Sequence, residues 1–160
     1  MTTPSDVRIL AIDPGTKRIG LAIGGFESGM ATRLAVLDVT PGAAGEAMAI
    51  DAIARHALEE GATGLLIGLP LNMDGTEGKE AIRARRFAGL VATRTGLSPQ
   101  FCDERLTSEE AKAVARQNGW TQRSGKPIDD LAAALLLQGF LDESRAKRTR
   151  DALGLPEDSR

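Results

Sequence analysis

Short apolar runs separated by turn residues occupy the first forty positions, a pattern that predicts β-strands. Val7 to Asp13 stops at Pro14-Gly15, and Ile19 to Gly24 follows directly, so these two runs are expected to form a hairpin. A third run, Leu34 to Val39, ends at Thr40-Pro41. Three antiparallel strands therefore open the fold.

After residue 41 the spacing of apolar residues changes from that of a strand to that of a helix. Residues 42–61 have apolar positions at helical spacing, with Gly61 placed to end the helix: Ile50, Ile53, Ala54, Ala57 and Leu58. Gly64 to Gly68 predicts a buried strand parallel to the first. Lys79 to Thr95 predicts a second helix and Gln100 to Asp103 a further strand, while two more helices are expected from Thr107 and from Pro127.

This order of elements predicts an α/β fold. It consists of a mixed five-stranded sheet, three antiparallel strands followed by parallel strands, flanked by helices on both faces. A length of 160 residues suits a single domain, with its core at 7–142 and flexible tails at 1–6 and about 149–160.

The amino-acid composition excludes several classes of protein and of metal site. With 42% hydrophobic and 26% charged residues, the chain is typical of globular proteins and not of disordered or fibrous ones. One Cys and one His exclude a disulfide framework and a Cys/His zinc site within the chain, so a bound metal would need carboxylates. The longest apolar stretch, Leu131 to Leu137, is too short to span a bilayer, and no leader pattern is visible. We expect a cytoplasmic protein with no membrane partner.

Asp13 ends an otherwise apolar strand, where a carboxylate is costly to desolvate unless it is paired, hydrogen-bonded or bound to a cation. Strand alternation places it on one face with Ile9 and Ala11. A turn aspartate that accepts the amide of Gly15 or Thr16 would explain it equally well.

Two further acidic pairs lie at the ends of predicted elements. Asp103-Glu104 closes the last strand, and Asp129-Asp130 lies in the first turn of the last helix. Neighbours point in different directions, so only one member of each pair can face a common site. A solvated charge cluster and helix N-terminal stabilisation are the simpler explanations. Together, three carboxylates form an oxygen-rich set suited to Mg²⁺ or Mn²⁺ and to hydrolysis of a phosphodiester by water.

Four segments, in this order, resemble the YqgF (RuvX) family over residues 7–142: Ala11–Gly20 (AIDPGTKRIG), Gly68–Gly75 (GLPLNMDG), Asp103–Thr107 (DERLT) and Ile128–Ala133 (IDDLAA). The resemblance implies a ribonuclease H-like fold related to the RuvC Holliday-junction resolvases. It also implies a metal-dependent endonuclease that processes the 5′ end of pre-16S rRNA during ribosome biogenesis. It places the catalytic and metal-binding triad on Asp13, Glu104 and Asp129. Family members usually have a single Asp at the last position, where this chain has Asp129-Asp130.

Several polar residues are candidates for substrate binding, as phosphate partners or as a polar loop contact: Lys17, Arg18, Asn72, Arg86, Arg105 and Arg123. Ordinary exposed cations and a loop-stabilising amide are the alternative interpretations. Asp74, before Gly75, is assigned to turn formation.

The formal charge of −2 conceals an uneven distribution. Residues 79–126 contain ten basic and five acidic side chains, and five of the basic ones lie on the helix at 79–95. This predicts a phosphate-binding surface, and therefore a nucleic acid partner, either structured rRNA precursor or branched DNA. Symmetric nicking of a DNA junction would require a homodimer, and ribosomal or transcription partners are compatible with the chain.

Three other functions compete with an rRNA nuclease. A Holliday-junction-type DNA resolvase would use the same carboxylates. A non-catalytic RNA-binding ribosome or transcription factor would keep the fold without cleavage. Sugar kinases and actin-like ATPases also have Asp-x-Gly-Thr after a strand, but they need two such lobes, and this chain has room for one.

Overall fold

The computed structural model describes residues 7–104, 113, 116–117, 119 and 129–156. Its elements are β1 (Arg8–Pro14), β2 (Arg18–Gly25), β3 (Ala31–Asp38), α1 (Ala43–Glu59), β4 (Gly64–Leu69), α2 (Lys79–Thr95), β5 (Pro99–Asp103) and α4 (Asp129–Leu153). The start of the helix expected from Thr107 lies outside the described residues, although 113 and 116–117 are helical. Among the described helices, none is long and apolar enough to cross a membrane.

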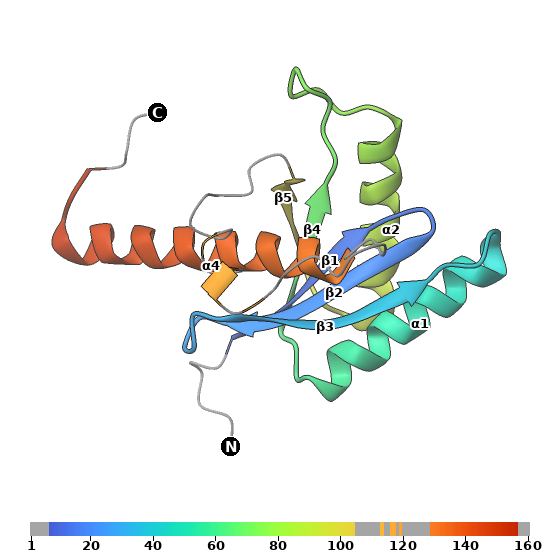
Figure 1. The fold of residues 1–160 in the computed structure, drawn as a ribbon, viewed down its shortest axis with the longest axis horizontal. Helices are drawn as coiled ribbons and strands as arrows, with labels where there is room; N and C mark the ends of the chain where they lie inside the picture. The colour runs from blue at the N-terminus through green and yellow to red at the C-terminus, as the bar shows by residue number, and fades with distance from the viewer. Residues whose placement is uncertain (1–6, 105–112, 114–115, 118, 120–128, 157–160) are drawn as a thin grey trace.

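The five strands form one sheet in the order β3-β2-β1-β4-β5. β1 pairs antiparallel with β2, and β2 with β3, whereas β1–β4 and β4–β5 are parallel. This confirms the predicted mixed sheet. Because β1 is central and β4 separates it from β5, the carboxyl ends of these three strands meet at one edge of the sheet (Figure 1).

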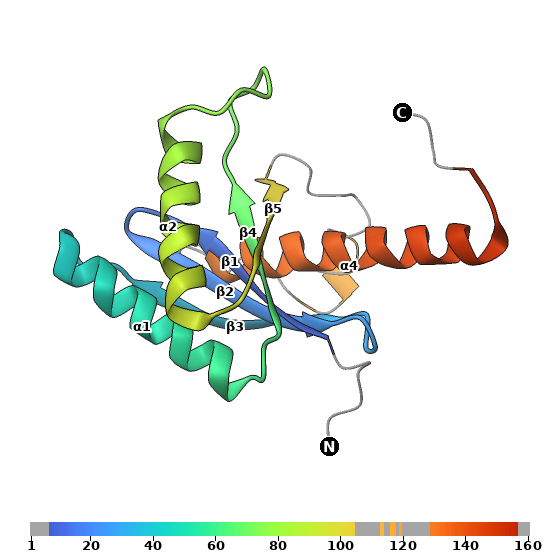
Figure 2. The same ribbon diagram turned by 180° about the vertical axis from the view of Figure 1, so that it is seen from behind.

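Helices cover both faces of the sheet, as predicted. α1 and α2 lie on one face and α4 on the other (Figures 1 and 2). Alternation along β1 divides its side chains between two cores: Leu10 and Ile12 pack with α1 and α2, whereas Ile9 and Ala11 pack with α4. The face to which each β1 residue points is therefore settled by its position in the strand.

Three local predictions differ from the structure. β3 begins at Ala31 and not at Leu34, because its first residues pair with the end of β2. Leu58 is 84% exposed, since α1 buries only the side that carries Ile53 and Ala57. α4 continues to Leu153, so residues 149–153 are helical where a tail was expected.

Candidate active site

Asp13 lies near the carboxyl end of β1 on the α4 side of the sheet. It follows Ile9 and Ala11 on the same face, and both pack against Ala133 and Leu137 of α4. The predicted alternation is thus confirmed for the apolar residues that precede it. The carboxyl group of Asp13 is directed to the layer between sheet and helix.

Glu104 reaches the same layer from β5. It directly follows this strand, which is in register with β4, so that Cys102 lies beside Gly68. A Cβ added at Gly68 would lie 2.6 Å from Glu104 Oε1 and 2.8 Å from Leu136 Cδ1. The space that Gly68 leaves empty therefore accommodates the Glu104 carboxyl. Sequence reasoning missed this role of Gly68, although a glycine at the end of a buried strand often marks a close approach.

The two carboxyl groups are in direct contact. Glu104 hydrogen-bonds to Asp13, which requires a proton between them, and the pKa of Glu104 rises from 4.5 to about 8. Burial is the largest cause, followed by the hydrogen bond to Asp13 and the negative charges of Asp13 and Asp103. Without a cation, this pair retains a proton that a free glutamate would release.

For Asp129, the third member of the expected triad, the structure describes only the backbone. Asp129 begins α4, and the side chains of Asp129 and Asp130 lie outside the described residues. Within the described part of the chain, no group of three or more His, Cys, Asp or Glu side chains gathers in a metal-binding arrangement. The structure brings together Asp13 and Glu104, while the role of Asp129 stays a prediction.

The loop after β4 is held by its own polar side chains. Asn72 donates from Nδ2 to Thr76 Oγ1 at 3.0 Å, and its backbone N–H donates to the Thr76 carbonyl at 2.9 Å. Asp74 Oδ1 accepts the Thr76 N–H at 3.0 Å, which confirms its assignment to turn formation. These bonds support the loop-stabilising interpretation of Asn72, and a contact with substrate remains a prediction.

The residues predicted to bind phosphate differ in their exposure and in their partners. Lys17 is exposed in the turn after β1, and Arg18 is half-buried at the start of β2. Arg86 makes a two-pronged ion pair with Glu46 of α1, at 3.0 and 3.1 Å, which raises the pKa of its guanidinium. Arg105 and Arg123 lie outside the described residues.

The basic helix predicted from the sequence is largely neutralised in the fold. Each of its four arginines pairs with a carboxylate: Arg83 with Glu80, Arg85 with Glu77, Arg86 with Glu46, and Arg94 with Asp51. Two of these partners belong to α1. Glu46 lies 40 positions from Arg86 along the chain, and Asp51 lies 43 positions from Arg94. Such pairing reduces the positive field that α2 can offer to phosphates.

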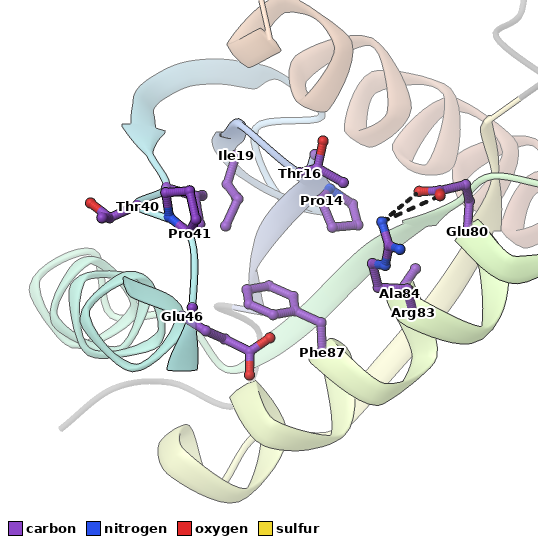
Figure 3. Close-up of a pocket in the computed structure, with 13 residues that line it drawn as sticks. Pro14, Thr16, Ile19, Thr40, Pro41, Glu46, Glu80, Arg83, Ala84 and Phe87 are labelled. Atoms are coloured by element: carbon purple, nitrogen blue, oxygen red, sulfur yellow. Dashed lines mark hydrogen bonds and ion pairs between the residues drawn. The ribbon is translucent and has the colours of Figure 1, made fainter. Parts of the chain in front are cut away.

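A hollow of about 200 Å³ lies at the same end of β1 but on the opposite face (Figure 3). Figure 3 shows Pro14, Ile19, Pro41 and Phe87 around it, with Glu46 at one side. Since Asp13 faces α4 and this hollow faces α1 and α2, the hollow is not the carboxylate site.

Comparisons with known proteins agree with this geometry. The chain matches the RuvX family, described as Holliday junction resolvase, over residues 7–143. A protein of Pseudomonas fluorescens (strain SBW25) named "Putative pre-16S rRNA nuclease" is 40% identical over 86% of this chain and 94% of its own length. A relative of the same name from Anaeromyxobacter dehalogenans is 42% identical over 85% and 97%, respectively.

Solved structures support the fold. RuvC of Thermus thermophilus superimposes with a TM-score of 0.61 at 13% identity, covering 88% of this chain and 97% of that chain. The Fowlpox virus resolvase, solved with Holliday junction DNA, gives a TM-score of 0.52 at 12% identity, over 86% and 99%. Both likenesses concern the ribonuclease H-like fold. The fold is thus shown by the solved structures, and the family match and the identities above show that the chain is a hydrolase and belongs to the RuvX (YqgF) family of ribonuclease H-like nucleases.

Proposed function

We propose that the protein is a metal-dependent endonuclease that hydrolyses phosphodiester bonds and processes the 5′ end of pre-16S rRNA in the cytoplasm. The observation that carries this proposal is the contact between Asp13 and Glu104 at the edge where β1, β4 and β5 end. The names of relatives at about 40% identity point to the RNA substrate.

The donor chemistry of the site fits a divalent cation. Asp13 and Glu104 provide only oxygen atoms, one of which, Glu104 Oε1, is buried. A cation bound by this pair would compensate both the burial of the Glu104 carboxylate and the negative charge of Asp13, which together raise the Glu104 pKa to about 8. Mg²⁺ and Mn²⁺ prefer such hard oxygen ligands. We propose that Asp129, at the start of α4, supplies the third carboxylate.

A divalent ion at these ligands would lower the pKa of a water molecule and stabilise the charge that develops on the scissile phosphate. The remaining tasks belong to the chain. Asp13 lies in a paired strand and Glu104 directly follows another, so both need little rearrangement to bind the ion. Lys17, exposed in the turn that follows β1, can neutralise a neighbouring phosphate of the substrate.

A four-way DNA junction is the second candidate substrate, because the matching family is described as Holliday junction resolvase. Symmetric nicking of a junction needs two active sites, and hence a homodimer. The relatives at about 40% identity are named as nucleases, which argues against an ATPase that closes two lobes around a nucleotide.

A parallel cleavage assay with Mg²⁺ on precursor rRNA and on a four-way junction tests the proposal. Asp13→Asn and Glu104→Gln should each reduce cleavage by more than about 100-fold without unfolding. Asp103→Asn, at the adjacent position, is the matched control and should retain most activity. Separate Asp129→Asn and Asp130→Asn variants decide which residue completes the triad. Equal activity of Asp13→Asn and the parent protein would overturn the mechanism, and binding without cleavage would favour a non-catalytic factor.

A further inference from the structure

The C-terminal half of α4 forms one wall of a groove with the β2–β3 hairpin. The groove has a volume of about 340 Å³ and includes Phe26, Gly29, Leu141, Arg145, Arg148 and Leu153 among its lining residues. In Figures 1 and 2 this part of α4 extends beyond the strands, away from the edge that carries Asp13 and Glu104. The groove is therefore separate from the candidate active site.

Both arginines of the groove are held in place by uncharged partners. The Arg148 guanidinium lies 4.3 Å from the centre of the Phe26 ring. The Arg145 guanidinium lies against Gly29, which is buried with φ 65°, and a Cβ at this glycine would overlap it. These contacts restrict the two side chains but do not neutralise them.

Arg145 and Arg148 differ from the α2 arginines, each of which has a carboxylate partner. Among the described residues, no carboxylate forms an ion pair with Arg145 or Arg148. Asp142, one turn before Arg145, instead accepts a hydrogen bond from Gln138 Nε2 at 3.0 Å. Two restrained guanidinium groups with unneutralised charge suit a phosphate, which arginine can bind through two parallel hydrogen bonds.

The helix sets the distance between the groove and the carboxylates. Leu136 and Glu104 both lie against Gly68, so Leu136 marks the level of the carboxylates along α4. Arg148 follows twelve residues later. At a rise of 1.5 Å per residue this is about 18 Å along the helix.

We infer that this groove binds the phosphate backbone of a duplex arm of the RNA substrate, about 18 Å from the cleaved bond. The inference rests on the proposed function for the identity of the ligand. The occupant is a phosphodiester backbone, since the groove offers two guanidinium groups above an apolar floor. Such a contact adds affinity and fixes the orientation of the arm without reading its sequence.

Fluorescence anisotropy with labelled RNA hairpins tests the inference. Binding is measured in the Asp13→Asn background with Mg²⁺, so that a failure of cleavage does not affect the result. One hairpin has a twelve-base-pair stem that starts at the cleavage position, and the other has a three-base-pair stem. The test variant is Arg145→Gln with Arg148→Gln. Lys147→Gln with Arg150→Gln is the control, because it removes the same charge from helix positions that do not line the groove.

The groove variant should bind the long hairpin about tenfold more weakly, with a salt dependence reduced by about two phosphate contacts, and should bind the short hairpin like the parent. The control variant should bind both hairpins normally. Equal losses in both variants would show a diffuse charge effect and overturn the groove, as would an unchanged affinity for the long hairpin. Arg145→Lys with Arg148→Lys keeps the charge but loses the two parallel hydrogen bonds, so it should bind the long hairpin more tightly than the glutamine variant and more weakly than the parent. Binding as weak as that of the glutamine variant, at an unchanged melting temperature, would overturn a role for charge.

Discussion

Replacing Glu104 by Gln should stabilise the metal-free protein at alkaline pH. In the folded state the pKa of Glu104 is raised from 4.5 to about 8, first by burial and then by its contact with Asp13. The folded protein therefore holds this proton more tightly than the unfolded chain does. Between pH 4.5 and about 8, stability falls as pH rises, because the folded protein must then bury a negatively charged Glu104 carboxylate next to the negative charge of Asp13. Glutamine removes this penalty and can still donate a hydrogen bond to Asp13.

The magnitude follows from the size of the shift. For an isolated and fully shielded group, such a shift would correspond to about 5 kcal/mol. The Glu104 side chain is only partly buried and shares its proton with Asp13, so solvent screening and coupling reduce the expected gain to about 1–2 kcal/mol near pH 8. For a chain of this length that is a rise of about 3–6 °C in melting temperature. Near pH 5 the variant and the parent should have similar stability.

Thermal melts in EDTA between pH 5 and 8.5 measure this difference, with Glu59→Gln at the exposed end of α1 as the control. Titration with Mg²⁺ should stabilise the parent protein by mass action and leave Glu104→Gln nearly unchanged. If Glu104→Gln melts below the parent protein across the whole pH range, repulsion between the two carboxylates is not a property of this site.

Gly68→Ala should reduce cleavage at least tenfold and cost about 1–3 kcal/mol of stability, because its Cβ would displace the neighbouring carboxylate. Gly64→Ala, in the same strand with open space around its Cβ, should behave like the parent protein in both assays. Gln138→Leu should lower the free energy of unfolding by about 2–4 kcal/mol in urea denaturation, since this buried amide accepts the Ala31 N–H and donates to the hairpin; a loss below about 0.5 kcal/mol would contradict that role. Arg86→Ala should leave the KM for RNA unchanged, because its guanidinium is already paired with α1; a raised KM would support the substrate-binding role expected from the sequence.

The local pattern of apolar and turn residues was sufficient to predict the strands and helices. It also predicted which face of β1 its residues share. Strand alternation depends only on neighbouring positions, so the face shared by Ile9 and Ala11 could be predicted and the structure confirms it. The same reasoning left Asp103 and Glu104 equivalent, since the end of β5 is also where strand geometry ends. The resemblance to the family selected Glu104. The structure shows that its carboxyl contacts Asp13 beside Gly68.

The order of strands and helices, the mixed sheet and the carboxylates at element ends could be predicted from the sequence, because they follow from periodicity and turn chemistry within a few residues. Which charges remain available to a ligand depends instead on contacts between elements that are far apart in the sequence. The α2 arginines are neutralised in part by acids some 40 positions away on α1, whereas Arg145 lies against Gly29 and Arg148 lies over Phe26. A charge becomes free or paired through long-range packing, so the total charge of a segment does not show where a phosphate can bind.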